Sequence, residues 1–125
     1  MQILLLDDNE ELCDFLVANL QESGIDAKSA NNSADALQLL RTEKFDALIV
    51  DLQLAGEDGF DFIQKVRENR SGKSIPVMLL SEYDTTLARR VAADYACNAF
   101  LSKPFTTTHL LDSLRGLSKE ATIQH

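Results

Sequence analysis

The chain has no tryptophan and is poor in cysteine and histidine, with two of each among its 125 residues. Cys13 and Cys97 are far apart, lack the spacing of metal ligands and have no histidine nearby. We therefore interpret both as small buried hydrophobic residues, which argues against zinc binding and thiol catalysis. His109 and His125 are expected to be solvated.

Long hydrophobic runs are also missing. No apolar segment approaches the ~18 residues that cross a bilayer, and the N-terminus lacks the basic flank and cleavage site of a signal peptide. We expect a cytoplasmic protein with no membrane partner.

Basic residues are outnumbered, 12 against 20 acidic ones, for a net charge of −8. Such a charge repels phosphate backbones, so this domain is not expected to contact nucleic acid directly.

What the sequence does contain is an ordinary globular composition, 45% hydrophobic and 26% charged. Its length fits one domain with a substantial core. We assign that domain to residues 1–118 and interpret residues 119–125 as a tail or the start of a linker.

Short apolar runs alternate along the chain with longer segments of helical periodicity. We predict five strands, at Gln2–Leu6, Ala27–Ala30, Ala47–Asp51, Val77–Leu80 and Ala99–Leu101. Runs such as Leu48-Ile49-Val50 are apolar without interruption, which is typical of strands buried on both faces. The pattern therefore predicts a parallel sheet covered by helices.

Helices are predicted over about 9–23, 59–69, 85–95 and 107–117, with another that begins after Ser33 as its N-cap. The first helix is expected to share one apolar face among Leu12, Leu16, Leu20 and Phe15. Strict alternation of strand and helix predicts a doubly wound α/β sheet with right-handed crossovers.

Polar side chains stand where the predicted strands end, and ligands of such sheets bind at that edge. They are Asp7-Asp8 after the first strand, Asp51 at the third, Ser81 at the fourth and Ser102-Lys103-Pro104 at the fifth. Three clustered carboxylates repel one another and need a cation or raised pKa values. Carboxylate oxygens with room for water suit Mg²⁺, and one lysine cannot neutralise three acids.

With Mg²⁺ bound, the metal and Lys103 supply positive charge and Ser81 supplies a hydrogen-bond donor. One carboxylate can then act as a nucleophile toward a phosphoryl donor and form an aspartyl phosphate. Taken singly, each residue has a plainer interpretation, as a helix N-terminus, a turn, a cap or a solvated lysine. Their joint placement at four strand ends favours a phosphoryl-accepting site.

At these residues the sequence resembles the receiver domain of two-component response regulators. The likeness covers Met1 to about Leu117, with motifs at residues 3–9, 48–54 with Gly56 and Asp58-Gly59, 78–81 and 101–105. It implies a flavodoxin-like fold of five helices and five parallel strands in the order 2-1-3-4-5. It also implies a phosphorelay protein that catalyses its own phosphorylation and slow dephosphorylation but is not otherwise an enzyme.

The resemblance assigns a role to each acidic residue. Asp51 matches the phosphoacceptor, Asp8 a direct Mg²⁺ ligand and Asp7 a ligand acting through water. Gln53 matches the position whose backbone carbonyl binds the metal. The implied phosphodonor is a histidine kinase or a phosphotransfer protein, which docks mainly on the first helix.

The resemblance also implies a switch. Ser81 matches the hydroxyl that turns toward the phosphoryl group, Lys103 the lysine that pairs with it, and Phe100 the aromatic residue that swings inward. The bond before Pro104 is then expected to be cis. The face formed by the fourth helix, fifth strand and fifth helix would change, and a downstream protein or a linked output domain would respond.

Glu82 departs from the family pattern, because a small residue usually follows the switch hydroxyl. We hypothesise that its carboxylate slows self-phosphorylation by small donors. Glu82 also favours the alternative of a receiver-like interaction module that never uses phosphoryl chemistry.

A haloacid-dehalogenase-type phosphatase is disfavoured because Asn9 occupies the place of its second Asp. A flavodoxin-like cofactor binder lacks support, since no glycine- or hydroxyl-rich loop follows the first strand.

Overall fold

The structure is a computed structural model that describes residues 1–54, 56–69, 72, 74–82, 86–94 and 97–123, with backbone alone at 87, 91 and 118–123. Its main sheet contains β1 (Gln2–Leu6), β2 (Asp26–Ala30), β3 (Ala47–Asp51), β6 (Val77–Ser81) and β7 (Ala99–Ser102). A hairpin of β4 (Gln53–Leu54) and β5 (Glu57–Asp58) follows β3. The helices are α1 (Glu10–Glu22), α2 (Ser33–Thr42), α3 (Gly59–Glu68), α4 (Thr86–Asp94) and α5 (Thr107–Ile123).

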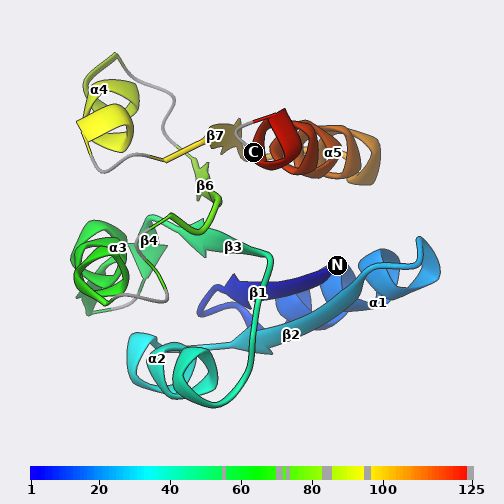
Figure 1. Ribbon diagram of the computed structural model, residues 1–125, viewed down its shortest axis with the longest axis horizontal. Helices are drawn as coiled ribbons and strands as arrows, with labels where there is room; N and C mark the ends of the chain where they lie inside the picture. Colours follow the sequence, from blue (N-terminus) through cyan, green and yellow to red (C-terminus); the bar gives the residue numbers. More distant parts are fainter. Residues whose placement is uncertain (55, 70–71, 73, 83–85, 95–96, 124–125) are drawn as a thin grey trace.

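The five strands of the main sheet run parallel in the order β2-β1-β3-β6-β7. Counted within this sheet, the order is the predicted 2-1-3-4-5, so the doubly wound, flavodoxin-like α/β fold is confirmed. In Figure 1, α1 and α5 lie along one side of the sheet and α2, α3 and α4 along the other. The strand order reverses between β1 and β3, which is where such folds bind their ligands.

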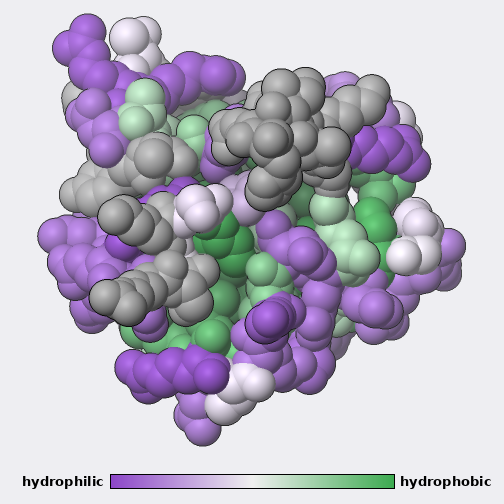
Figure 2. Space-filling model, viewed as in Figure 1, coloured by the Kyte–Doolittle hydropathy of each residue, from purple (hydrophilic) through white to green (hydrophobic). Residues whose placement is uncertain are grey.

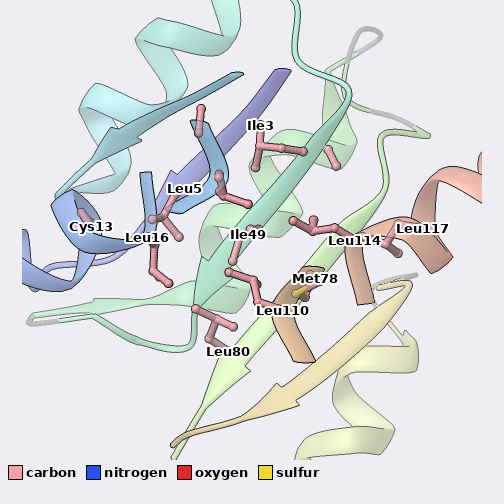
Figure 3. Packing of buried hydrophobic residues seen from close by; sticks show 13 residues of the cluster. Ile3, Leu5, Cys13, Leu16, Ile49, Met78, Leu80, Leu110, Leu114 and Leu117 are labelled. Atoms are coloured by element: carbon pink, nitrogen blue, oxygen red, sulfur yellow. The ribbon is translucent and has the colours of Figure 1, made fainter. Parts of the chain in front are cut away.

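Each face of the sheet carries its own hydrophobic core, because side chains alternate along every strand. Ile3 and Leu5 of β1 pack with residues of α1 and α5 (Figure 3). Leu4 and Leu6 pack with Phe62 and other residues of α3 on the opposite face. Each such side chain contributes about 1.5–3 kcal/mol when buried. Hydrophilic side chains dominate the rim of the molecule in Figure 2, with hydrophobic ones visible toward the middle.

The N-cap of α2 differs from the prediction by one residue. Asn32 is the cap, and its Oδ1 accepts a hydrogen bond from the Asp35 amide at 2.8 Å. Ser33, predicted to be the cap, is instead the first residue of the helix, and its hydroxyl donates to Glu57 at 2.6 Å. Two adjacent cap-forming residues are hard to rank from sequence, since either side chain can satisfy a first-turn amide.

Phe15 does not belong to the buried face of α1, so that part of the prediction is wrong. Its side chain is 59% exposed, whereas Leu16 and Leu20 are 1% and 0% exposed. Successive residues of a helix are rotated by about 100°, so the residue directly before Leu16 points well away from the sheet. An aromatic ring is thereby left on the surface of α1.

Two further differences concern the ends of elements. Helix α5 continues to Ile123, past the predicted end at 117. Helix α4 covers Thr86–Asp94, and its predicted ends at 85 and 95 lie outside the described residues. Among the helices that the structure describes, none combines the length and apolar character needed to span a membrane.

Gly59 brings the start of α3 against the backbone that follows β3. A Cβ added there would lie 2.8 Å from the carbonyl oxygen of Asp51 and 3.0 Å from the Cα of Leu52. Both atoms belong to the main chain, so the clash cannot be relieved by a side-chain rotation. Gly116 differs, because it is exposed in α5 and an added Cβ would meet nothing within 4 Å.

These two glycines predict opposite effects of the same substitution. We expect Gly59→Ala to lower the free energy of unfolding by about 1–3 kcal/mol through overpacking. Gly116→Ala should raise it by up to about 1 kcal/mol, since alanine is the better helix former. Urea unfolding followed by circular dichroism measures both, and a Gly59→Ala variant as stable as the parent would contradict the close approach of α3.

Candidate functional site

The parallel register brings the predicted polar residues to one edge of the sheet. Asp51 ends β3 and is paired in register with Leu80, next to Ser81 at the end of β6. Ser81 in turn is paired with Ser102 at the end of β7, directly before Lys103. Asp7 follows β1. Four strand ends therefore place their side chains together, as the sequence predicted.

The acidic residues form a compact cluster. One carboxylate oxygen each from Asp7, Asp8 and Asp51 lies within 4.8 Å of the others. Asp7 and Asp51 are buried, at 0% and 2% exposure, and Asp8 is exposed. Three hard oxygen donors with one side open to water fit Mg²⁺, which takes few protein carboxylates and keeps several waters.

Lys103 is the cation that faces this cluster. Its Nζ lies 3.0 Å from Oδ2 of Asp51 and 3.2 Å from Oδ2 of Asp7. Burial lowers the pKa of Lys103, but the hydrogen bond to Asp51 and the two carboxylate charges outweigh burial and raise its pKa. The main chain fixes the lysine too, because its amide donates to the Ser81 carbonyl at 2.7 Å. The Lys103–Pro104 bond is cis, as predicted.

The surroundings of Asp7 disfavour its charged form. Burial raises its pKa, and the charge of Asp51 raises it further, although the Asn9 amide and Lys103 act in the opposite direction. The Asn9 amide donates to its Oδ1 at 3.0 Å. The Asn31 side chain donates to the Asp7 carbonyl at 3.1 Å, which holds the main chain in place. One lysine therefore faces a cluster of three carboxylates.

Both carboxylate oxygens of Asp51 have a defined partner. Oδ1 accepts the Gln53 amide at 2.9 Å, and Oδ2 accepts from Lys103. The Leu52 amide donates to the Leu80 carbonyl at 3.0 Å, which extends the β3–β6 ladder past Asp51. The carboxylate is therefore held in one orientation at the sheet edge.

The Gln53 side chain contributes contacts that the sequence did not predict. Its Nε2 donates to Oγ of Ser81 at 3.1 Å, and its Oε1 accepts from the Glu82 amide at 3.2 Å. Only a backbone role had been assigned to this position. The sequence carries no signal for the direction of this side chain, because the strand that holds it is only two residues long.

Phe100 lies apart from the carboxylates. It is half-buried on β7 and packs against the core on the α3 and α4 side of the sheet. The guanidinium carbon of Arg89, on α4, lies 4.9 Å from its ring centroid, within the range of a cation–π contact. Of the predicted site residues, this is the one that the fold does not bring to the acidic cluster.

An open groove of about 530 Å³ runs beside the site, between α1 and the start of α5. Its lining includes the exposed ring of Phe15, the ring of Phe105 and the polar residues Glu82 and Lys103. An apolar surface thus leads directly to the lysine of the cluster.

The chain matches the response regulator receiver domain family over residues 3–115. It therefore belongs to that family, and the resemblance seen in its sequence is confirmed. Receiver domains typically bind Mg²⁺ at an acidic cluster, and the structure contains an acidic cluster of Asp7, Asp8 and Asp51.

Individual relatives agree with this assignment. The transcriptional regulatory protein GltR of Pseudomonas aeruginosa is 29% identical over 119 residues, which are 95% of this chain and 49% of GltR. The chain thus spans about half the length of that curated relative. Chemotaxis protein CheY4 of Vibrio cholerae shares the fold with a TM-score of 0.89 at 24% identity, covering 93% of this chain and 97% of that one. The receiver domain of Francisella response regulator 1452 has a TM-score of 0.86 at 26% identity, covering 96% and 98%.

The raised pKa of Asp7 predicts how pH acts on the metal-free protein. A carboxyl group whose pKa is higher in the folded state favours folding below its ordinary pKa of 3.8, and this contribution is lost as pH rises through the raised value. At pH 7 without divalent cations, Asp7→Asn should therefore be more stable than the parent. Urea titrations in EDTA measure this difference, which should shrink toward pH 4.

Asp26→Asn is the matched control, because it neutralises an exposed carboxylate on β2. It should change stability little at either pH. A parent protein more stable than Asp7→Asn at pH 7 in EDTA would show that the lysine fully compensates the buried acid.

Proposed function

We propose that this chain is the phosphoacceptor of a phosphorelay, in which Asp51 takes a phosphoryl group from a histidine kinase or phosphotransfer protein. The contact of Lys103 with both Asp51 and Asp7, inside a cluster of three acids, is the observation that carries this proposal. This arrangement brings together a nucleophile in Asp51, a fixed positive charge in Lys103 and a group of acids that could hold a cation.

The proposed reaction transfers one phosphoryl group. A carboxylate oxygen of Asp51 forms a bond to phosphorus while the bond from phosphorus to the donor's nitrogen breaks and the imidazole leaves. Lys103 stabilises the charge on the phosphoryl oxygens as they approach. Attack of water on phosphorus would later release inorganic phosphate and restore the carboxylate, which is the slow self-dephosphorylation that the proposal includes.

Mg²⁺ would be held by the carboxylates of Asp8 and Asp51 and the backbone carbonyl of Gln53, with Asp7 acting through water. When bound, it supplies positive charge for the phosphoryl oxygens. Lys103 is already placed to keep Asp7 and Asp51 oriented. The exposed position of Asp8 leaves that side of the cluster open to a hydrated cation.

The response to phosphorylation is proposed to pass through Ser81 and Phe100. Ser81 would turn its hydroxyl toward the new phosphoryl group, and Phe100 would move inward from beneath Arg89. The face of α4, β7 and α5 would then present a different surface to a downstream protein or a linked output domain. No direct contact of this domain with nucleic acid or membrane is part of the proposal, and we place it in the cytoplasm.

The groove beside α1 supports a docking surface for the phosphodonor. The exposed Phe15 offers an apolar contact in this groove, and Lys103, which also lines the groove, contacts Asp51. A helical donor that presents a phosphohistidine can bury the ring while its phosphoryl group reaches the lysine. A receiver-like module that never uses phosphoryl chemistry is the alternative, favoured only by the exposed Glu82 at the same groove.

Phosphorylation of Asp51 can be tested with acetyl phosphate and Mg²⁺. The parent protein should gain the mass of one phosphoryl group, which peptide mapping should locate at Asp51. Asp51→Asn should gain none, because the amide lacks a nucleophilic carboxylate oxygen. Asp61→Asn, an exposed acid on α3, is the control and should behave like the parent. An unmodified parent protein, which also fails to bind beryllofluoride, would favour the interaction module.

Glu82 predicts a slow reaction with small anionic donors. Its exposed carboxylate lines the groove together with Lys103, so it repels an approaching phosphate. Glu82→Ala should therefore react with acetyl phosphate several-fold faster than the parent, an effect equivalent to roughly 1 kcal/mol of repulsion. Glu68→Ala, which removes an exposed acid from α3, should leave the rate unchanged. Equal rates in the parent and Glu82→Ala would disprove the repulsion.

A further inference from the structure

We propose that the Gln53 side chain is a positioning residue that latches Ser81 and the start of the β6–α4 loop in their resting arrangement. This inference rests on the proposed function, because it concerns how readily the site responds to a phosphoryl group. Its basis is a single carboxamide that binds two neighbouring groups, Oγ of Ser81 at 3.1 Å and the Glu82 amide at 3.2 Å.

The backbone of Gln53 is held firmly enough to act as an anchor. Its amide donates to Asp51, Leu54 next to it is buried, and Gln53 pairs with Asp58 across the β4–β5 hairpin. The hairpin is itself tied to α2, since Glu57 accepts from the Ser33 amide at 3.1 Å and from its hydroxyl at 2.6 Å. The side chain that contacts Ser81 and Glu82 therefore extends from a fixed backbone position.

The orientation of the carboxamide follows from its partners. The Glu82 amide can only donate, so the group facing it must be Oε1. Nε2 then faces Ser81 and donates into the hydroxyl oxygen. Both ends of the carboxamide are therefore used.

These contacts favour the resting state. A change of the Ser81 side-chain rotamer that carries Oγ toward Asp51 would break the Gln53 contact, and a displacement of the Glu82 amide would break the other. A contact made in one state and lost in another shifts the equilibrium toward the first. A partly exposed hydrogen bond of this kind changes such an equilibrium roughly three- to tenfold.

The test compares the parent with Gln53→Met, which keeps the length and bulk of the side chain and removes both polar ends. Beryllofluoride with Mg²⁺ serves as the phosphoryl mimic, and NMR titration gives its apparent Kd. We expect binding to be roughly three- to tenfold tighter in Gln53→Met. Gln64→Ala, an exposed glutamine on α3, is the control and should bind like the parent.

A second measurement reads the latch without any phosphoryl mimic. In the metal-free protein, the Glu82 amide should exchange its hydrogen faster in Gln53→Met, and its ¹⁵N resonance should move, because its acceptor is gone. A general loss of stability would instead accelerate exchange in the cores of both faces. In a Ser81→Ala background, Gln53→Met should change beryllofluoride affinity less than it does in the parent, since one of the two contacts is already missing.

The outcomes separate the latch from the proposed function. Unchanged or weaker beryllofluoride binding by Gln53→Met, with a parent that binds, overturns the latch and leaves the phosphoacceptor proposal standing. An unchanged Glu82 amide in the metal-free variant also overturns the latch. A parent that binds no beryllofluoride overturns the phosphoacceptor proposal and the latch with it.

Discussion

The whole edge of this sheet is organised around an imbalance of charge. Two buried carboxylates, Asp7 and Asp51, share one ammonium group, while a third carboxylate stands at the rim. Burial penalises each charge, and the two acids repel each other as well. The protein tolerates this because the strands on which the acids sit are fully packed on both faces. The packed core thus holds Asp7 and Asp51 close together, although their charges repel each other.

The same imbalance would make the site responsive under the proposed function. Under the proposed function, a cation or a phosphoryl group would change the balance of charge among Asp7, Asp51 and Lys103, and the groups that touch these residues would respond. Lys103 is joined to Ser81 through the main chain, and Ser81 is joined to Gln53 through side chains. The Glu82 amide would therefore receive the change through short, directional contacts, whereas Phe100 packs against the core on the α3 and α4 side of the sheet.

The sequence predicts most of this arrangement because its main signals are strong and local. Continuous apolar runs reveal buried parallel strands, and in such a sheet the residues after the strands must meet, which placed Asp51, Ser81 and Lys103 together. The signal weakens where alternatives are nearly equal. Asn32 and Ser33 can both cap a helix. A hydrophobic ring such as that of Phe15 is expected in the core unless its angular position around the helix axis is taken into account.

The sequence does not predict the hydrogen bonds of the Gln53 side chain for a different reason. A two-residue strand has no readable period, so the β4–β5 hairpin left no pattern, and without the hairpin the direction of the Gln53 side chain was undefined. Hydrogen bonds between side chains of distant segments depend on distances of a few tenths of an ångström, which no propensity encodes. The backbone role expected at this position stays a prediction.

The four strand ends that make the site are spread along almost the entire chain, from residue 7 to residue 103. During synthesis, the acids leave the ribosome well before the lysine that orients them. A chain that ends before β7 contains the three carboxylates of the cluster but not the lysine that contacts two of them. The parallel topology brings these residues together through non-local contacts, so under the proposed function the acceptor site is complete only once nearly the whole chain has folded.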